Sequence, residues 1–237
     1  MNRSVWDDDK CNEVWKHLVK DVPYDWDLKS RKVATRKLLD ILQIEQLPED
    51  QYLNADIVSA RGLRRLIGSV LRGDDEEKAI SIGKWVVSSW GGITAGLDSV
   101  PSWITELRPF SVSTINNFIE RIKTDRISSW SKIIAFADFD NHIIYDSRTA
   151  VALNAAMVMS KTRPVFYMPP SKSKQRQHCV KSIKAHSDDL SSGYEVYRYV
   201  LGRFVELGLT DSILEAERMI FAGADQTGIN LMASLQT

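Results

Sequence analysis

Cysteine is scarce in this chain of 237 residues, which contains only Cys11 and Cys179. Two cysteines so far apart exclude a disulfide framework and a four-cysteine metal cluster. No apolar run reaches the roughly 18–20 residues that a membrane helix needs. The opening stretch "MNRSVWDDDK" is acidic and lacks the apolar core of a secretion signal. We therefore expect a cytoplasmic protein without membrane association.

An excess of charge of either sign is also missing. The 31 Lys and Arg residues balance 31 Asp and Glu residues, so binding to nucleic acid requires a local basic patch. The histidines lack metal-ligand spacing, and no glycine-rich loop could hold a nucleotide phosphate, so we expect neither a metal nor another cofactor. The length permits one large domain or two small interlocked ones.

Alternating strand patterns are nearly absent, and "RPVFYMP" (163–169) is the best strand candidate despite its prolines. Helical periodicity dominates instead. In residues 112–122 apolar side chains recur at i, i+3, i+4 and i+7, with Ser111 or Ser113 as a cap. We predict an all-α, or nearly all-α, fold. The expected helices cover residues 27–44, 60–72, 74–90, 112–122, 128–138, 146–159, 191–209 and 211–223.

The domain division is less clearly marked in the sequence. Residues 1–75 form a first helical block, and residues 76–237 carry the more informative features. Between them, "RGDDEE" (72–77) is either a hinge or a capped helix start. N-terminal helices can return to the second half of a helical enzyme, so one interlocked domain is the alternative. The last expected helix begins at Asp211 as N-cap and stops at Gly223.

Residues 130–150, "WSKIIAFADFDNHIIYDSRTA", contain a lysine in an apolar helix start. If Ser128 or Ser129 caps this helix, Lys132 lies in its first turn, near the positive end of the helix dipole. That position and the apolar neighbours are expected to lower the amine pKa, which suits a nucleophile. The alternative is an ordinary lysine on the surface.

Asp146 follows Lys132 after a helix and a return segment. Ten helical residues cover about 15 Å, and four or five extended residues cover a similar distance. The spacing therefore allows Lys132 and Asp146 to approach each other. The alternative is that Asp146 only caps the next helix.

The segment "SKIIAFADFDNHIIYDSRTAVAL" (131–153) resembles the active-site segment of the helix-hairpin-helix DNA glycosylase superfamily. It is most similar to the bacterial branch that resembles oxoguanine DNA glycosylase. The resemblance covers roughly residues 80–225, with weaker likeness at 85–93 and 213–223. It implies a multi-helix glycosylase-like architecture in which Lys132 matches the superfamily's nucleophilic lysine and Asp146 its aspartate.

The chain departs from the superfamily in three respects. The Gly-x-Gly turn before the lysine helix is missing, so the helix-hairpin-helix is degenerate. The gap of 14 residues from Lys132 to Asp146 is shorter than in better-known members. The four cysteines of the iron–sulfur branch are absent.

The resemblance implies a DNA glycosylase that flips a modified base out of double-stranded DNA and excises it. Asp146 would stabilise the positive charge on the sugar, and Lys132 would attack it, with or without strand scission. Oxidised guanine or a hypermodified phage cytosine is the expected base, the latter in antiviral defence. We expect a monomer. The alternatives are a catalytically inactive DNA-binding module of the same fold and a helical protein–protein adaptor.

Residues 161–186 hold seven Lys and Arg residues, two histidines and no acidic residue. Such a patch is how a protein of zero net charge would bind DNA. Lys172, Lys174 and Arg176 are the expected phosphate contacts. Phe166 and Tyr167 are candidates to stack on the extruded base. Alternatively, this is a solvated basic loop and the aromatic rings belong to the core.

The remaining candidates surround the lysine motif. Ser129 and Ser131 at the helix start could bind phosphate in place of the missing glycine amides. Arg148 either orients Asp146, holds a phosphate or lies on the surface. Trp85 and Trp90 precede Gly91-Gly92, where DNA or a base could approach the backbone closely. They either line the base pocket or pack in the core.

Overall fold

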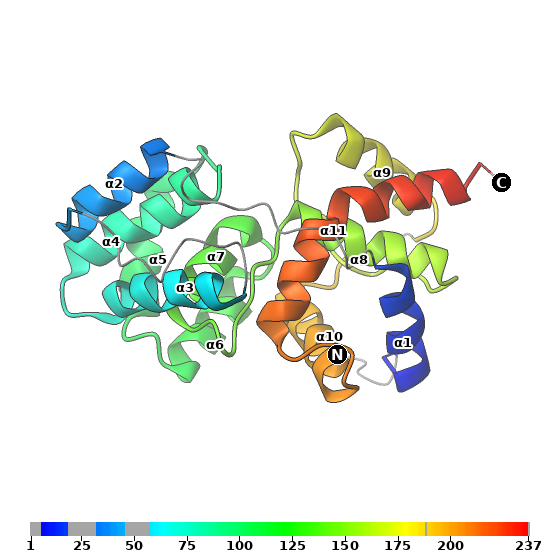
Figure 1. Cartoon of the computed structure of the whole chain (residues 1–237), viewed down its shortest axis with the longest axis horizontal. Coiled ribbons are helices and arrows are strands. Elements are labelled where there is room, and N and C mark those ends of the chain that lie inside the picture. The colour runs from blue at the N-terminus through cyan, green and yellow to red at the C-terminus, as the bar shows by residue number, and fades with distance from the viewer. Residues whose placement is uncertain (1–5, 19–31, 46–56, 188, 237) are drawn as a thin grey trace. The chain divides into compact units, whose positions relative to one another are not determined.

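The computed structural model describes residues 6–18, 32–45, 57–187 and 189–236. It confirms the all-α fold (Figure 1). β pairing in these ranges is confined to one parallel bridge between Phe166 and Ser192, where a strand was expected. The helices are α1 (Asp8–His17), α2 (Lys32–Leu42), α3 (Ile57–Arg72), α4 (Glu76–Trp85), α5 (Val100–Leu107), α6 (Val112–Ile122), α7 (Ile127–Ala137), α8 (Ser147–Met159), α9 (Lys174–Lys184), α10 (Tyr194–Glu206) and α11 (Ile213–Ser234), with a π-helix η4 (Val86–Trp90) and a 3₁₀ turn η5 (Leu97–Ser99).

The chain forms two compact units, which are divided at residues 24/25 and 144/145 rather than at the expected 75/76. One unit consists of residues 25–144 and is called the lysine unit here, because it contains Lys132. The other consists of residues 1–24 and 145–237 and is called the aspartate unit, because it contains Asp146. The expected boundary fails because α3 and α4, which lie on either side of it, pack together. The N-terminal helix α1 packs on α8 and α10 of the second half.

The lysine unit is built around α7. Ten of the eleven residues of this helix are buried, because it is apolar on nearly every side and a helix of that kind needs cover all round. Helix α3 and the π-helix η4 pack against α7, and α4 packs on α3. The side chain of Arg64 on α3 is buried as well, with its guanidinium 5.5 Å from the centre of the Phe136 ring. The central position of α7 therefore places Lys132 inside the unit.

The turn between α6 and α7 is made without glycine. Lys123 and Arg126 have positive φ angles of 54° and 49°, which non-glycine residues rarely adopt. The Arg126 guanidinium donates hydrogen bonds to Gly96 O at 3.0 Å and Ser99 Oγ at 3.2 Å. Because the chain turns at these residues, α7 begins at Ile127 without a side-chain cap. The expected caps, Ser128 and Ser129, instead lie inside the helix.

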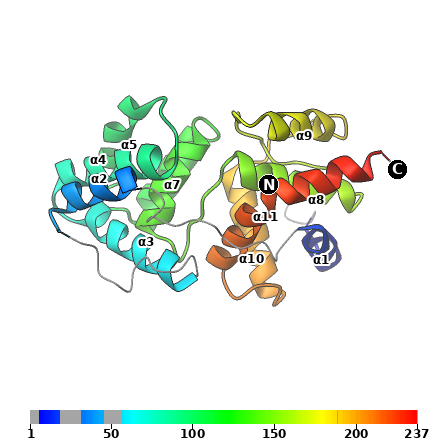
Figure 2. The ribbon, with the colours of Figure 1, turned by 45° about the horizontal axis from the view of Figure 1, so that its top comes forward.

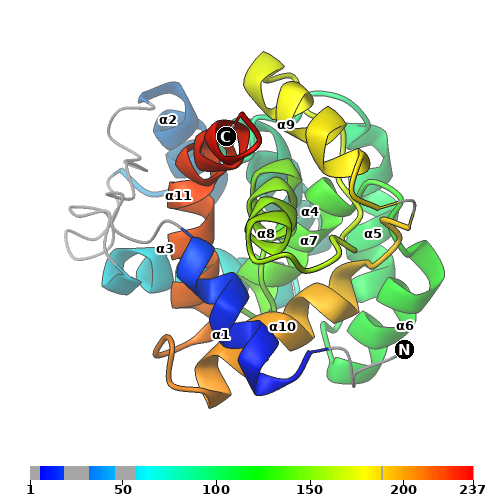
Figure 3. The same cartoon turned by 90° about the vertical axis from the view of Figure 1, so that its right-hand side faces the viewer.

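The aspartate unit is built around α8, with Thr149–Met157 buried throughout. Helices α1, α9 and α11 pack on it and surround it in Figure 3. Ser212, rather than Asp211, caps α11. The predicted stop at Gly223 was wrong, since α11 continues to Ser234. Gly223 is buried and its carbonyl accepts a hydrogen bond from Thr227 Oγ1 at 3.0 Å, so packing and local bonding override the tendency of glycine to end a helix.

Replacing Asn154 is expected to destabilise the aspartate unit strongly. Its buried side chain accepts from the N–H groups of Val165 (3.2 Å) and Phe166 (3.0 Å) and donates to Phe166 O (2.8 Å). Asn154→Ala leaves buried peptide groups without these partners, at a cost of about 2–4 kcal/mol. Thermal unfolding followed by circular dichroism should show the melting temperature falling by roughly 5–15 °C. The control is Asn117→Ala at an exposed position of α6, which should change the melting temperature little. An equal effect of the two variants would contradict this account.

Both thiols are expected to react slowly in the native protein. Burial raises the pKa of Cys11 to about 11 and also raises the pKa of Cys179. Since the thiolate is the reactive form, a thiol with that pKa is about 0.1% ionised at pH 8, against roughly a quarter for a free thiol. A chromogenic disulfide reagent at pH 8 should therefore react at least about 100-fold faster in urea than under native conditions, with the native rate rising towards pH 11. Fast native labelling at pH 8 would refute this.

None of the described helices combines the length and the apolar character required to cross a membrane.

Candidate functional site

Lys132 is buried in the lysine unit, with only 3% of its surface exposed. It is the sixth residue of α7, so the expected place in the first turn was wrong. Side chains of a helix lean towards its N-terminus, and Lys132 Nζ accordingly donates to Ser128 O at 2.6 Å. The amine thus lies near the start of the helix although its Cα does not. Burial excludes the alternative of an ordinary surface lysine.

The stem of Lys132 lies against Gly91, directly after the π-helix. A Cβ atom at Gly91 would come within 2.8 Å of Lys132 Cδ and 2.9 Å of Cε, and within 2.7 Å of Val87 O. The π-type bond from Gly91 N–H to Val86 O, at 2.9 Å, places the glycine there. At Gly91 the close neighbour is the lysine stem, and the expected approach of DNA or a base to Gly91-Gly92 stays a prediction. π-turns within helices are frequent at functional sites.

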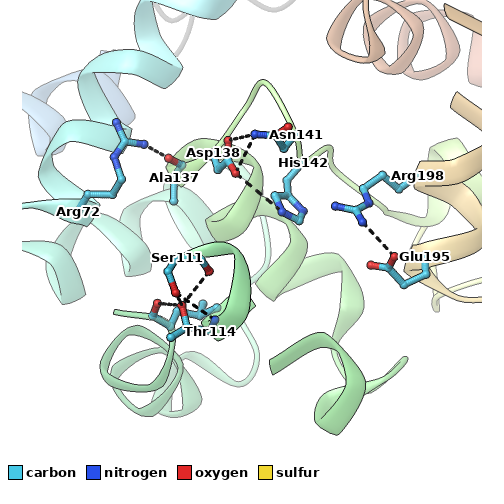
Figure 4. A network of polar contacts seen from close by, with 10 residues as sticks. Arg72, Ser111, Thr114, Ala137, Asp138, Asn141, His142, Glu195 and Arg198 are labelled. Atoms are coloured by element: carbon cyan, nitrogen blue, oxygen red, sulfur yellow. Dashed lines mark hydrogen bonds and ion pairs between the residues drawn. The ribbon is translucent and has the colours of Figure 1, made fainter. Parts of the chain in front are cut away.

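Polar side chains fix the chain where it leaves α7 (Figure 4). Asn141 Nδ2 donates to both carboxylate oxygens of Asp138, at 3.0 and 3.2 Å. His142 is 2% exposed, with Nε2 3.9 Å from Asp138 Oδ2. Arg72 of α3 donates to Ala137 O at the end of the helix. These contacts hold the turn that leads towards residue 144.

Asp146 is the N-cap of α8 in the aspartate unit. Its Oδ1 accepts from the N–H groups of Arg148 (2.8 Å) and Thr149 (3.2 Å), and Thr149 Oγ1 accepts from Asp146 N–H at 3.1 Å. This is a capping box, which orients the carboxylate at the positive end of the helix dipole. Asp146 therefore caps α8, which is compatible with a catalytic role and with a purely capping role, and the residue is half-buried.

Buried hydroxyl groups lie next to this cap. The Tyr145 hydroxyl donates to Tyr167 O at 2.5 Å, and the rings of Tyr145 and Tyr197 meet edge to face with centres 4.9 Å apart. Burial, and then the charges of Glu217 and Asp146, raise the pKa of Tyr197. Sequence reasoning missed this group. The one available signal was Glu217, a carboxylate at a buried position of α11.

Arg148 does not orient Asp146 with its guanidinium. That group lies over the ring of Phe221 on α11, 4.6 Å from the ring centre. The contact to Asp146 comes from the backbone N–H of Arg148. Arg148 therefore couples the start of α8 to α11 by a cation–π interaction.

Three of the four aromatic residues predicted for a base pocket are core residues. Trp85 is 2% exposed and donates from Nε1 to Ala34 O at 2.8 Å. Trp90 is 7% exposed and meets Phe136 edge to face. Phe166 is fully buried against Trp6 and Tyr197. Stacking on a base requires an accessible face, and Tyr167 alone of the four is half-buried.

Some of the predicted phosphate contacts are buried or paired within the protein, and others are exposed. Ser129 and Ser131 are buried inside α7, because the helix starts earlier than expected. Arg176 is paired with Asp225 at 2.9 Å and also donates to Ser171 Oγ. Lys172 and Lys174 are exposed as expected.

Lys132 and Asp146 belong to different units, so their approach to each other stays a prediction. Among the described residues no three His, Cys, Asp or Glu side chains gather as a metal site would require. Comparison of the chain with protein-family models, with curated proteins and with solved structures gave no match. The likeness to helix-hairpin-helix glycosylases therefore rests on the motif in residues 131–153.

Proposed function

We propose that the protein is a DNA glycosylase that flips a modified base out of double-stranded DNA and cleaves its N-glycosidic bond. The observation that supports this most is the placement of the two motif residues. Lys132 is a buried amine on the central helix of one unit, and Asp146 is an oriented carboxylate at the start of the central helix of the other. Each side chain is thus held by a buried helix within its own unit, and catalysis needs positioned groups of this kind.

Asp146 acts on the charge that develops during bond cleavage. As the base leaves with the electron pair of the glycosidic bond, positive charge builds on C1′ and the ring oxygen of the sugar. An ionised carboxylate stabilises that charge without itself being consumed. The two N–H donors of α8 fix its direction, so little reorganisation is required during the reaction.

Lys132 is the candidate nucleophile. Its neutral Nζ forms a bond to C1′ while the base departs and takes up a proton. The C1′–O4′ bond of the sugar ring then breaks, the amine proton passes to O4′, and a Schiff base is left between Lys132 and C1′. Loss of a proton from C2′ and departure of the 3′ phosphate, with a C2′–C3′ double bond formed, then cut the strand. If water attacks instead of Lys132, the product is an intact strand with an abasic site.

The substrate base we propose is oxidised guanine or a hypermodified cytosine of phage DNA. The first places the protein in DNA repair and the second in antiviral defence. Both follow from the resemblance of residues 131–153 to the bacterial glycosylase branch. In either case the protein works as a cytoplasmic monomer without a cofactor.

A catalytically inactive DNA-binding module of the same fold is the second candidate. It is favoured by the turn between α6 and α7, where Lys123 and Arg126 have positive φ angles and the superfamily's glycines are missing. The Arg126 guanidinium bonds to Gly96 and Ser99 in this structure. A module of this kind binds duplex DNA and leaves every base in place.

The test is a panel of DNA duplexes, each with one oxidised, deaminated, alkylated or phage-type modified base, incubated with the protein and borohydride. A covalent adduct with one duplex supports a glycosylase with lyase chemistry and identifies the base. Alkali-revealed abasic sites without an adduct support hydrolysis by water. Binding without either signal across the panel favours the inactive module.

A further inference from the structure

Helix α9 exposes one face that carries only basic and neutral side chains. Lys174, His178, Lys181 and Lys184 are all exposed. At 3.6 residues per turn, these positions fall within an arc of about 120° around the helix axis. Gln177 and Ala185 lie in the same arc and are also exposed. We call this surface the α9 basic face. Helix α9 was not among the helices expected from the sequence, so the common face of these residues was not foreseen.

The opposite side of α9 is anchored in the aspartate unit. Cys179 and Ile183 are buried in an apolar cluster with Val151, Ala155 and Leu231. Figure 2 shows α9 lying beside α8 and α11, on which it packs. Ser173 caps the helix, accepting from Arg176 N–H. The basic face is therefore carried by a helix of fixed orientation rather than by a loose loop.

The one arginine of α9 is on its inner side and is neutralised there. Arg176 is half-buried, and its guanidinium is paired with Asp225 of α11. Residues 161–187 contain no carboxylate, so the segment supplies no internal partner for its exposed lysines. In α9, therefore, the arginine on the inner side is paired with a carboxylate, and the lysines of the α9 basic face are exposed to solvent.

We propose that the α9 basic face binds the phosphate backbone of duplex DNA without regard to base or sequence. The face extends from Lys174 to Lys184, a rise of about 15 Å, over which the two strands of duplex DNA together present roughly nine phosphates. Lysine ammonium groups on flexible stems suit contacts of this kind, because they act as point charges and require no fixed geometry. Lys174 was expected to contact phosphate from the sequence; the structure adds His178, Lys181 and Lys184.

Duplex DNA is favoured over a lipid surface because the face lacks apolar side chains. A helix that lies on a membrane inserts large apolar residues beside its basic ones, and the exposed arc of α9 has none. This inference extends the proposed function but does not depend on catalysis. Backbone contact requires only exposed cations, whereas excision requires Lys132 and Asp146.

The test measures the affinity for an unmodified duplex by fluorescence anisotropy at salt concentrations from about 50 to about 200 mM, because the salt dependence of the affinity reports the number of phosphate contacts. The variant is the triple replacement Lys174→Gln, Lys181→Gln and Lys184→Gln. Each lost phosphate contact lowers the slope of log affinity against log salt by about 0.9, so we expect a slope smaller by about 2–3 and weaker binding at low salt. Because the three side chains are exposed, the melting temperature should stay unchanged.

The matched control is the triple replacement Lys16→Gln, Lys37→Gln and Lys84→Gln, which removes the same charge from exposed positions elsewhere. The proposal is overturned if the control lowers the slope as much, if the α9 variant binds like the wild type, or if the wild type does not bind unmodified duplex. It is also overturned if the α9 variant loses binding only to phosphatidylserine-containing vesicles. Excision in the substrate panel is a separate readout, so failure of this proposal and failure of the glycosylase proposal are distinguishable.

Discussion

Asp146→Asn is expected to lower excision of the substrate base at least about 100-fold while leaving the protein folded and able to bind DNA. The charge that stabilises the developing cation is lost, and removal of one electrostatic contribution of this kind costs about 10²–10³ in rate. Asparagine caps helices about as well as aspartate, and its side-chain oxygen can accept from the N–H groups of Arg148 and Thr149. The measurement is a single-turnover assay with saturating protein, accompanied by thermal unfolding.

A matched control separates the charge of Asp146 from its capping role. Asp75 caps α4 in the same manner, accepting from Lys78 N–H at 2.9 Å. Asp75→Asn makes the same chemical change at a cap outside the motif and should leave excision unaffected. If Asp146→Asn excises at the wild-type rate, Asp146 is only a cap and the proposed mechanism is wrong.

Lys132→Gln is expected to abolish the borohydride-trapped adduct. Glutamine retains much of the length of the stem that lies against Gly91, but its amide cannot form a Schiff base. A protein that uses Lys132 as nucleophile should lose adduct formation by at least about 1000-fold, because the positioned amine that forms the covalent bond is removed. The measurement is the yield of the covalent band on a denaturing gel.

Lys84→Gln is the control for Lys132→Gln. Lys84 is exposed at the end of α4 in the same unit, and its replacement should leave the adduct intact. If the Lys132→Gln protein forms no adduct but still produces alkali-labile sites, water is the nucleophile and Lys132 has a positioning role. An undiminished adduct would exclude Lys132 as the nucleophile and transfer the search to another amine.

Local patterns in the sequence were sufficient for much of the secondary structure. The spacing of Ile115, Phe118, Ile119 and Ile122 with the cap at Ser111 predicts α6, and α6 runs from Val112 to Ile122. Asp146 was expected at the start of a helix and is the N-cap of α8. Caps and periodicity are properties of neighbouring residues, so they can be recognised without knowing the fold.

Where the predictions were wrong, distant contacts had overridden a local preference. Gly223 does not end α11, since Leu231, beyond that point, is packed in a cluster with residues of α8. Helix α9 was not expected from the sequence, and its buried residues Cys179 and Ile183 anchor it in the aspartate unit. The lysine helix starts without a serine cap, because the turn at Lys123 and Arg126 sets its first residue.

The sequence by itself determined the all-α class, the cap at Asp146 and the candidate pair of Lys132 and Asp146. Only the tertiary structure decided that Lys132 is buried beside Gly91, that Trp85, Trp90 and Phe166 are core residues, and that Arg176 is paired with Asp225. The physical reason is that burial and ion pairing depend on which helices meet. Helix formation and capping depend on residues three or four positions apart, and these spacings can be recognised in the sequence without knowing the fold.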